Sequence, residues 1–141
     1  MSAAVGTARD LGVTHMAFGD LFLEDVRAYR LAMLDGTGIS PLFPLWGRDT
    51  SVLAREVLAK RVNAVITCVD PAQAPSSIAG RWYDEDLLRD LPPTVDPCGE
   101  NGEFHTFVAD GPGFAYPLEV EVGEIVERDG FVFADVLPTT A

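Results

Sequence analysis

Basic residues are scarce in this chain. Its 141 residues include 10 Lys or Arg and 22 Asp or Glu, which gives a formal net charge of −12 at pH 7. A broad nucleic-acid interface needs Lys and Arg to neutralise phosphates. An anionic membrane surface likewise repels an acidic protein. The composition therefore indicates neither a nucleic-acid-binding nor a membrane-binding protein.

Long hydrophobic runs and cysteines are also few. No apolar run reaches the roughly 18 residues of a membrane span, and the start M-S-A-A-V-G-T-A-R-D has no basic segment followed by an apolar block. Cys68 and Cys98 form neither a C-x-x-C motif nor a disulfide framework. No His, Cys and Asp set has zinc spacing. We therefore expect a cytoplasmic protein in a reducing compartment, with no structural metal.

The first 70 residues alternate between helical and strand patterns. Helices are expected over residues 2–11, 23–34 and 52–61, and strands over residues 13–18, 39–46 and 63–69. Such alternation is typical of parallel strands joined by right-handed crossovers. The expected fold class is therefore α/β, beginning with a partial parallel sheet and flanking helices.

The second half has a different character. A loop rich in Pro, Ser and Ala covers residues 70–79, and a short acidic helix over 83–91 ends at Pro92-Pro93. Strands are expected over residues 103–109, 118–126 and 130–136, and the turn Arg128-Asp129-Gly130 indicates a hairpin. We expect residues 1–70 to form the α/β part and residues 71–141 to form a β-rich, α+β module.

One short stretch, residues 96–108, gathers chemically useful side chains and reads D-P-C-G-E-N-G-E-F-H-T-F-V. Gly99 and Gly102 allow positive φ and a close backbone approach to a ligand. If the turn brings Glu100 and Glu103 to one side, their carboxylates could bind an ammonium ion, a substrate cation or a metal. The alternative is a turn whose carboxylates are solvated.

The residues around this turn could likewise be either functional or structural. His105 could act as a general base or a polar contact, and Thr106 could donate a hydrogen bond to a substrate. A histidine alternating out of a strand would also explain the pattern. Cys98 would need a base and an activating environment to serve as a nucleophile, so a buried or a turn cysteine is favoured instead. Cys68 lies in an apolar strand and is expected in the core.

A second group of candidates follows the first two strands. Gly19 and Asp20 close one strand at the expected carboxyl edge of the sheet, where ligands of open α/β sheets bind. Asp20 could equally cap the next helix. Arg27 and Arg30 lie on that helix and could form a plain solvated face. Trp46 follows the next strand, and it could stack on a ring or pack in the core.

Three segments together resemble the diphthine–ammonia ligase family. G-E-N-G-E-F-H-T-F (99–107) resembles that family's E-G-G-E-[YF]-[EH]-T-F signature. G-D-L-F-L-E-D-V-R-A-Y-R (19–30) is similar to its G-D-[IL]-x-x-x-[YD]-x-R-x-x-[RE] segment, and P-L-F-P-L-W-G-R (41–48) to its P-L-x-P-L-W-x-R segment. They occur in family order and cover almost the whole chain.

The resemblance implies a fold and an activity. It implies that residues 1–70 are the C-terminal part of a Rossmann-like domain of the PP-loop, adenine nucleotide alpha-hydrolase-like type, and that residues 71–141 bind substrate. In intact relatives ATP, with Mg, would adenylylate a carboxylate, and ammonia would then displace AMP to give an amide. The partners implied are a small-molecule or protein carboxylate acceptor and ammonium. In archaea and eukaryotes that acceptor is a modified histidine of elongation factor 2.

The resemblance also assigns roles to the candidate residues. It implies catalytic roles for Glu100, Glu103 and His105. It implies substrate or nucleotide binding by Gly19, Asp20, Arg27, Arg30, Trp46, Gly99, Asn101, Gly102 and Thr106.

One departure from the family pattern leaves several alternatives open. The sequence has no S-G-G-K-D-S loop, whose backbone N–H groups and Lys would hold the ATP phosphates. We expect a truncated or partial form whose own cofactor is absent. The alternatives are a non-catalytic module that binds a small molecule or peptide, and a subunit that completes an ATP site with a separate N-terminal chain. An exposed sheet edge would also favour a homodimer.

Overall fold

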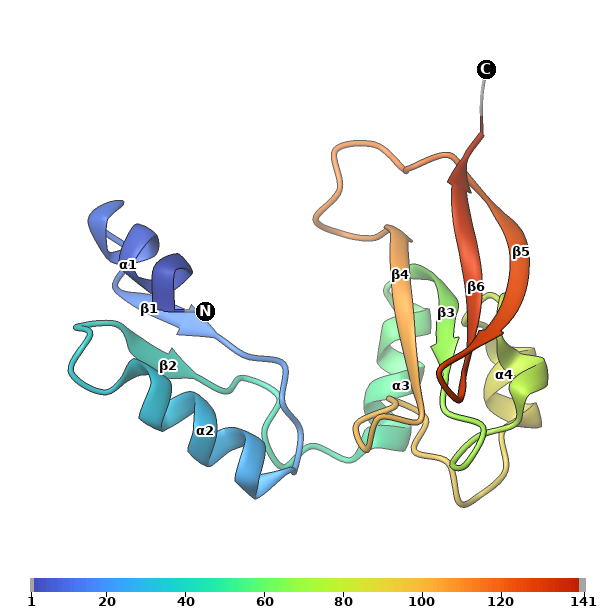
Figure 1. Cartoon of the computed structure of the whole chain (residues 1–141), viewed down its shortest axis with the longest axis horizontal. Coiled ribbons are helices and arrows are strands. Elements are labelled where there is room, and N and C mark those ends of the chain that lie inside the picture. The colour runs from blue at the N-terminus through green and yellow to red at the C-terminus, as the bar shows by residue number, and fades with distance from the viewer. Residues whose placement is uncertain (1, 140–141) are drawn as a thin grey trace. The chain divides into compact units, whose positions relative to one another are not determined.

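A computed structural model of the chain describes residues 2–139 (Figure 1). The chain divides between Arg48 and Asp49 into two compact units, called here the first unit and the second unit. Within the described residues, no helix is both long and apolar enough to cross a membrane.

The first unit contains two helices and two short parallel strands. They are α1 (Ser2–Asp10), β1 (His15–Ala17), α2 (Glu24–Leu34) and β2 (Ser40–Leu42). β1 and β2 pair in parallel with Met16 opposite Pro41, as the sequence predicted for these two segments. The Phe18 N–H donates to the Leu42 carbonyl at 2.9 Å, so the pairing continues one residue past the strands. A small core of Val5, Leu34 and Ile39 holds the unit together.

The second unit begins at a capped helix. The elements in order are α3 (Thr50–Ala59), β3 (Asn63–Val69), η1 (Ser76–Ile78), α4 (Glu85–Asp90), β4 (Phe104–Asp110), β5 (Val120–Arg128) and β6 (Phe131–Pro138). The Asp49 carboxylate accepts from the Val52 N–H at 2.9 Å, and the Asp84 carboxylate accepts from the Leu87 N–H at 2.7 Å. Such caps satisfy backbone donors that a helix leaves unpaired at its start.

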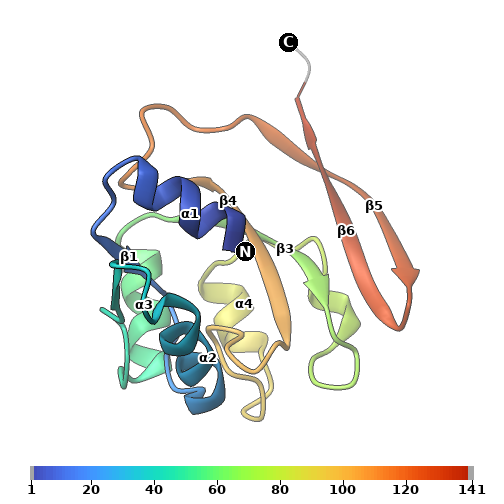
Figure 2. The same cartoon turned by 60° about the vertical axis from the view of Figure 1, so that its left-hand side comes forward.

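The sheet of the second unit has four antiparallel strands in the order β4-β3-β6-β5. The expected hairpin joins β5 to β6, and Asp129 and Gly130 in its turn have positive φ values of 54° and 82°. Positive φ at both central residues suits a two-residue turn between twisted strands. Figure 2 shows this hairpin as a long pair of neighbouring strands.

The expected pairing of residues 63–69 was wrong. This segment is a strand, but β3 lies between β4 and β6 and pairs antiparallel with both. The parallel sheet described here contains only β1 and β2. The reason is that an apolar run shows that a strand is buried on its faces but does not specify its hydrogen-bonding partners. The strand expected to complete the first part therefore belongs to the second unit.

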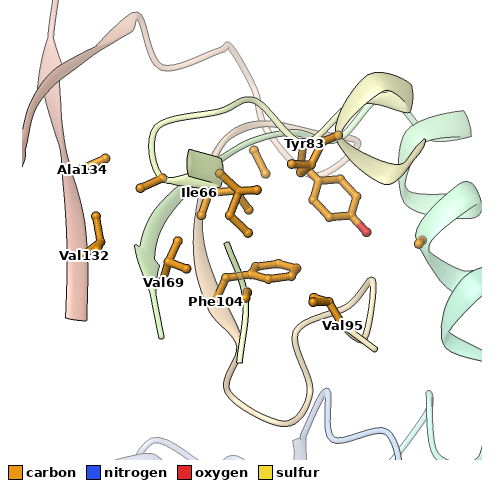
Figure 3. Close-up of a cluster of buried hydrophobic side chains, with 13 residues drawn as sticks. Ile66, Val69, Tyr83, Val95, Phe104, Val132 and Ala134 are labelled. Carbon is orange, nitrogen blue, oxygen red and sulfur yellow. The ribbon is translucent and has the colours of Figure 1, made fainter. Parts of the chain in front are cut away.

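A single core lies against the sheet of the second unit. Figure 3 shows Ile66 and Val69 of β3 between the β6 side chains on one side and Tyr83, Val95 and Phe104 on the other. Ile66, Val69 and Leu87 are fully buried. Because Phe104 is the first residue of β4 and is itself in this core, it anchors the segment that precedes it.

Candidate functional site

The segment that precedes β4 forms a tight loop, called here the signature loop (residues 96–103). The Gly99 N–H donates to the Asp96 carbonyl at 2.9 Å, and the Gly102 N–H donates to the Gly99 carbonyl at 3.1 Å. Gly99 and Gly102 have φ values of 68° and 86°, which glycine adopts without strain. The two glycines thus make the successive turns that the sequence indicated.

Glu103 lies inside the signature loop, with 2% of its surface exposed. Its Oε1 accepts from the Asp96 N–H at 2.9 Å and from Asn101 Nδ2 at 2.9 Å. Its Oε2 accepts from the Asn101 N–H at 3.0 Å. One carboxylate therefore ties both ends of the loop together.

This environment sets the charge of Glu103. Burial alone would raise the pKa of its carboxyl, but the hydrogen bonds from Asn101 and the Asp96 backbone outweigh burial and hold that pKa below its ordinary value. Glu103 is therefore ionised at neutral pH. The Glu103 side chain turns inward and accepts from backbone N–H donors, so it is neither a solvated turn carboxylate nor one exposed to a ligand.

Glu100 and Asn101 occupy the outer part of the signature loop. The Glu100 N–H donates to Asp96 Oδ2 at 2.9 Å, and its side chain is half-buried. Asn101 is exposed, although its amide reaches back to Glu103. Of the two predicted catalytic acids, Glu100 is thus the more exposed one.

His105 and Thr106 follow on β4, and both are exposed. Consecutive side chains of a strand point to opposite faces of the sheet. Thr106 therefore shares a face with Phe104 and the core, and His105 points to the other face. The structure does not bring these two predicted site residues to one side.

Cys98 is held as a neutral thiol. Its Sγ donates to the Thr50 carbonyl at 3.4 Å. Burial, followed by the nearby acids Asp96, Glu100 and Asp49, raises the pKa of Cys98 to about 11. Because the thiolate is the nucleophilic form, this environment disfavours nucleophilic chemistry.

We expect alkylation of Cys98 by iodoacetamide to be slow. A pKa of about 11 instead of the ordinary 9.0 leaves about 100-fold less thiolate at pH 8. The measurement is the labelling rate at several pH values in a Cys68→Ser background, with the urea-unfolded protein as the control. A folded rate equal to the unfolded rate would contradict the described environment.

Tyr83 supports the same loop from the core. Its hydroxyl donates to the Pro97 carbonyl at 2.6 Å. Burial, with smaller contributions from Cys98 and Asp96, raises the pKa of Tyr83 well above its ordinary value, so the hydroxyl keeps its proton.

The first unit gathers the second set of candidates at the carboxyl ends of β1 and β2. The Asp20 carboxylate pairs with Arg30 Nε at 3.4 Å. The Arg27 guanidinium lies 4.6 Å from the Trp46 ring centroid. Gly19 is exposed between Phe18 and Asp20. Asp20 thus pairs with an arginine of α2 and Trp46 packs against the other one, so these residues form one group within the first unit.

Sequence reasoning missed two residues of this group, Phe18 and Phe43. Their rings stack with centroids 5.6 Å apart. Phe18 also lies under the Arg30 guanidinium at 5.1 Å, and Phe43 lies under that of Arg27 at 5.3 Å. A signal was available, because Phe18 is next to the candidate Gly19 and Phe43 lies three residues before the candidate Trp46. We call Phe18, Asp20, Arg27, Arg30, Phe43 and Trp46 the arginine–aromatic cluster.

Metal ligands are not assembled in the part of the chain that the structure describes. Residues 2–139 contain no group of three or more His, Cys, Asp or Glu side chains placed to hold a metal ion.

Comparison with known proteins places the second unit in a family. Residues 49–135 match the family described as the diphthamide synthase C-terminal domain. The chain is 33% identical over 103 residues to the diphthine–ammonia ligases of Rattus norvegicus and Homo sapiens, and 32% identical to that of Bos taurus. Each match covers 70% of this chain and 39% of the relative, so the chain spans well under half of these proteins. The matched domain begins at Asp49, the first residue of the second unit, and this chain therefore belongs to the diphthamide synthase family through its C-terminal domain.

Proposed function

We propose that this chain carries the acceptor side of an ATP-dependent amide ligase of the diphthine–ammonia ligase type. The observation that supports this most is the signature loop within residues 49–135, in which the buried Glu103 holds Asp96 and Asn101 while the Asp96 carboxylate holds the Glu100 N–H. The relatives are diphthine–ammonia ligases, and we take from them the substrate class, a diphthine carboxyl group and ammonia. The phosphates of ATP and their Mg would be held by a segment with the S-G-G-K-D-S loop.

The proposed reaction has two steps. A carboxylate oxygen of the acceptor attacks the α-phosphorus of ATP and pyrophosphate leaves, which gives an acyl-adenylate. Ammonia then attacks the acyl carbon, AMP leaves, and a proton is released as the amide forms. The acceptor must be held while both steps occur, since positioning converts them into steps within one complex.

Glu100 takes a specific role in this proposal. A carboxylate forms charge-assisted hydrogen bonds to an ammonium ion or to another cationic group of the acceptor. Glu100 lies at the outer turn of a loop whose own hydrogen bonds fix its shape. Glu103 acts as a positioning residue behind it.

A chimeric enzyme tests this function. Residues 49–135 would replace the matching segment of the Rattus norvegicus ligase, and incorporation of 15N-ammonium into a diphthine-bearing protein would be measured. We expect the chimera to form the amide in an ATP-dependent way. Glu100→Gln in the chimera should lower kcat/KM by about tenfold to 100-fold, as expected for loss of a hydrogen bond to a charged group.

The control is Glu121→Gln, which removes the same charge from an exposed position on β5. It should leave kcat/KM within about twofold of the unsubstituted chimera, since isolated surface changes have small effects. A folded chimera without ATP-dependent amidation would favour a binding module over a ligase. Full activity in the Glu100→Gln chimera would refute the role given to Glu100.

A further inference from the structure

Although the chain is rich in acids, none of the described carboxylates pairs with Arg27. Within residues 2–139, no ion pair involves Arg27, and its Nε is buried without a hydrogen-bond partner. Its guanidinium lies 4.6 Å from the Trp46 centroid and 5.3 Å from the Phe43 centroid. The aromatic rings hold the cation in place but offer no acceptor for its N–H groups.

Arg30 has a different environment one turn along α2. Its Nε donates to Asp20 Oδ2 at 3.4 Å, and its guanidinium lies over Phe18 at 5.1 Å. The described ion pair of Asp20 is therefore with Arg30 and not with Arg27. Of the two arginines in the cluster, Arg27 is the one whose Nε is buried without an acceptor.

A buried N–H without an acceptor lowers stability, and an oxyanion would supply that acceptor. The guanidinium presents a planar fork of donors that matches a carboxylate or a phosphate. Phe43 and Trp46 follow β2, so the fork lies beyond the carboxyl ends of the two parallel strands, the edge at which open α/β sheets bind ligands.

We propose that Arg27, held by Phe43 and Trp46, is the binding group for a small oxyanion, either a carboxylate or a phosphate. The neighbouring Arg30 adds positive charge, which Asp20 partly offsets. This site stands on contacts within the first unit alone and does not depend on the proposed amidation. Its test therefore measures binding without any acyl transfer.

The experiment is a titration of the full chain, labelled with 15N, at constant ionic strength. The probes are inorganic phosphate, pyrophosphate and glutarate, and the signals are Arg27 Nε–H and the Trp46 indole N–H. We expect saturable shifts of both signals, with a Kd on the order of millimolar. Response to the phosphates alone identifies a phosphoryl ligand, and response to glutarate alone identifies a carboxylate. Absence of a saturable shift with all three probes would overturn the proposal.

Three variants sharpen the test. Arg27→Gln should weaken binding at least tenfold, and Arg27→Lys, which keeps the charge but loses the fork, should weaken it less. The matched control is Arg9→Gln, which removes one positive charge from an exposed residue of the same unit, and its Kd should stay within twofold of the wild type. Equal affinity in wild type and Arg27→Gln would overturn the proposal.

The variant Asp20→Asn distinguishes an oxyanion-binding site from a cluster that only stabilises the fold. It removes the negative charge beside the site and releases Arg30, so oxyanion binding should become several-fold tighter even if the unit becomes less stable. This variant also keeps the proposal testable if Arg27→Gln fails to fold. Unchanged or weaker binding in Asp20→Asn would contradict the proposed site.

Discussion

Replacing Glu103 with Gln is expected to lower the free energy of unfolding of the second unit by about 2 to 3 kcal/mol. The carboxylate accepts three N–H donors from Asp96 and Asn101. Glutamine has one acceptor oxygen, and its NH2 group must face at least one of these donors. A buried donor is then left unsatisfied, and the charge that strengthened the remaining bonds is lost.

The measurement is urea unfolding followed by the fluorescence of Trp82, which lies in the second unit. Glu121→Gln serves as the control and should stay within about 0.5 kcal/mol of the wild type. If Glu103→Gln proved as stable as that control, the loop would not depend on the buried carboxylate.

The pH dependence of this effect has a definite sign. Because the folded state lowers the pKa of Glu103, its stabilising contribution is fully present above the ordinary value of 4.5. That contribution is lost as the pH falls below 4.5 and through the lower pKa of the folded state. The gap in stability between the wild type and Glu103→Gln should therefore shrink on acidification below pH 4.5. A gap that widened at low pH would contradict the assignment.

Replacing Gly99 with Ala is expected to lower the free energy of unfolding by about 2 to 3 kcal/mol. Its φ of 68° lies in the left-handed region, where a side chain costs about 1 to 2 kcal/mol. An added Cβ would also lie 2.9 Å from the Phe104 carbonyl oxygen and 3.1 Å from the Phe104 ring. Neither group can move easily, because Phe104 is 4% exposed and begins β4.

Gly102→Ala provides a matched control within the same loop. Gly102 has a φ of 86°, but an added Cβ there would meet nothing within 4 Å. It should show the backbone cost alone, about 1 to 2 kcal/mol. The difference between the two variants in urea unfolding then isolates the contact with Phe104. Equal destabilisation by both substitutions would show that the close approach at Gly99 is not a constraint.

Local features of the fold were predictable from the sequence. The helices at 24–34, 50–59 and 85–90 appear close to their expected positions, because periodic apolar residues and the acceptors Asp49 and Asp84 mark them. The β5–β6 hairpin follows from a turn whose residues tolerate positive φ. Such signals lie within a few residues of the element that they determine.

Long-range pairing was not predictable in the same way. β3 reads as a buried strand, but its partners β4 and β6 lie far along the chain. Alternating helices and strands suggested a parallel neighbour, whereas both edges of β3 are satisfied by antiparallel strands of the second unit. The apolar composition of a strand carries little information about the direction of its neighbours.

In the candidate site, too, the features set by nearby residues were predictable from the sequence, and those set by the folded loop were not. The glycines of the signature loop follow from turn chemistry, and the positions of Asp20 and Trp46 follow from the ends of the two parallel strands. The inward position of Glu103 does not, because it depends on how the loop folds back on its own backbone N–H groups. In the sequence the two glutamates look alike, and only the folded loop distinguishes the buried Glu103 from the half-buried Glu100.

The most direct test of the acceptor site is a titration of the 15N-labelled chain with a peptide that carries diphthine. The same peptide with an unmodified histidine is the control. We expect the backbone amides of residues 99–107 to shift with the diphthine peptide. We also expect Glu100→Gln to weaken binding about tenfold, while Glu121→Gln leaves it unchanged. Diphthine binding that leaves the amides of residues 99–107 unmoved, or that is as tight in Glu100→Gln as in the wild type, would contradict the proposed acceptor site.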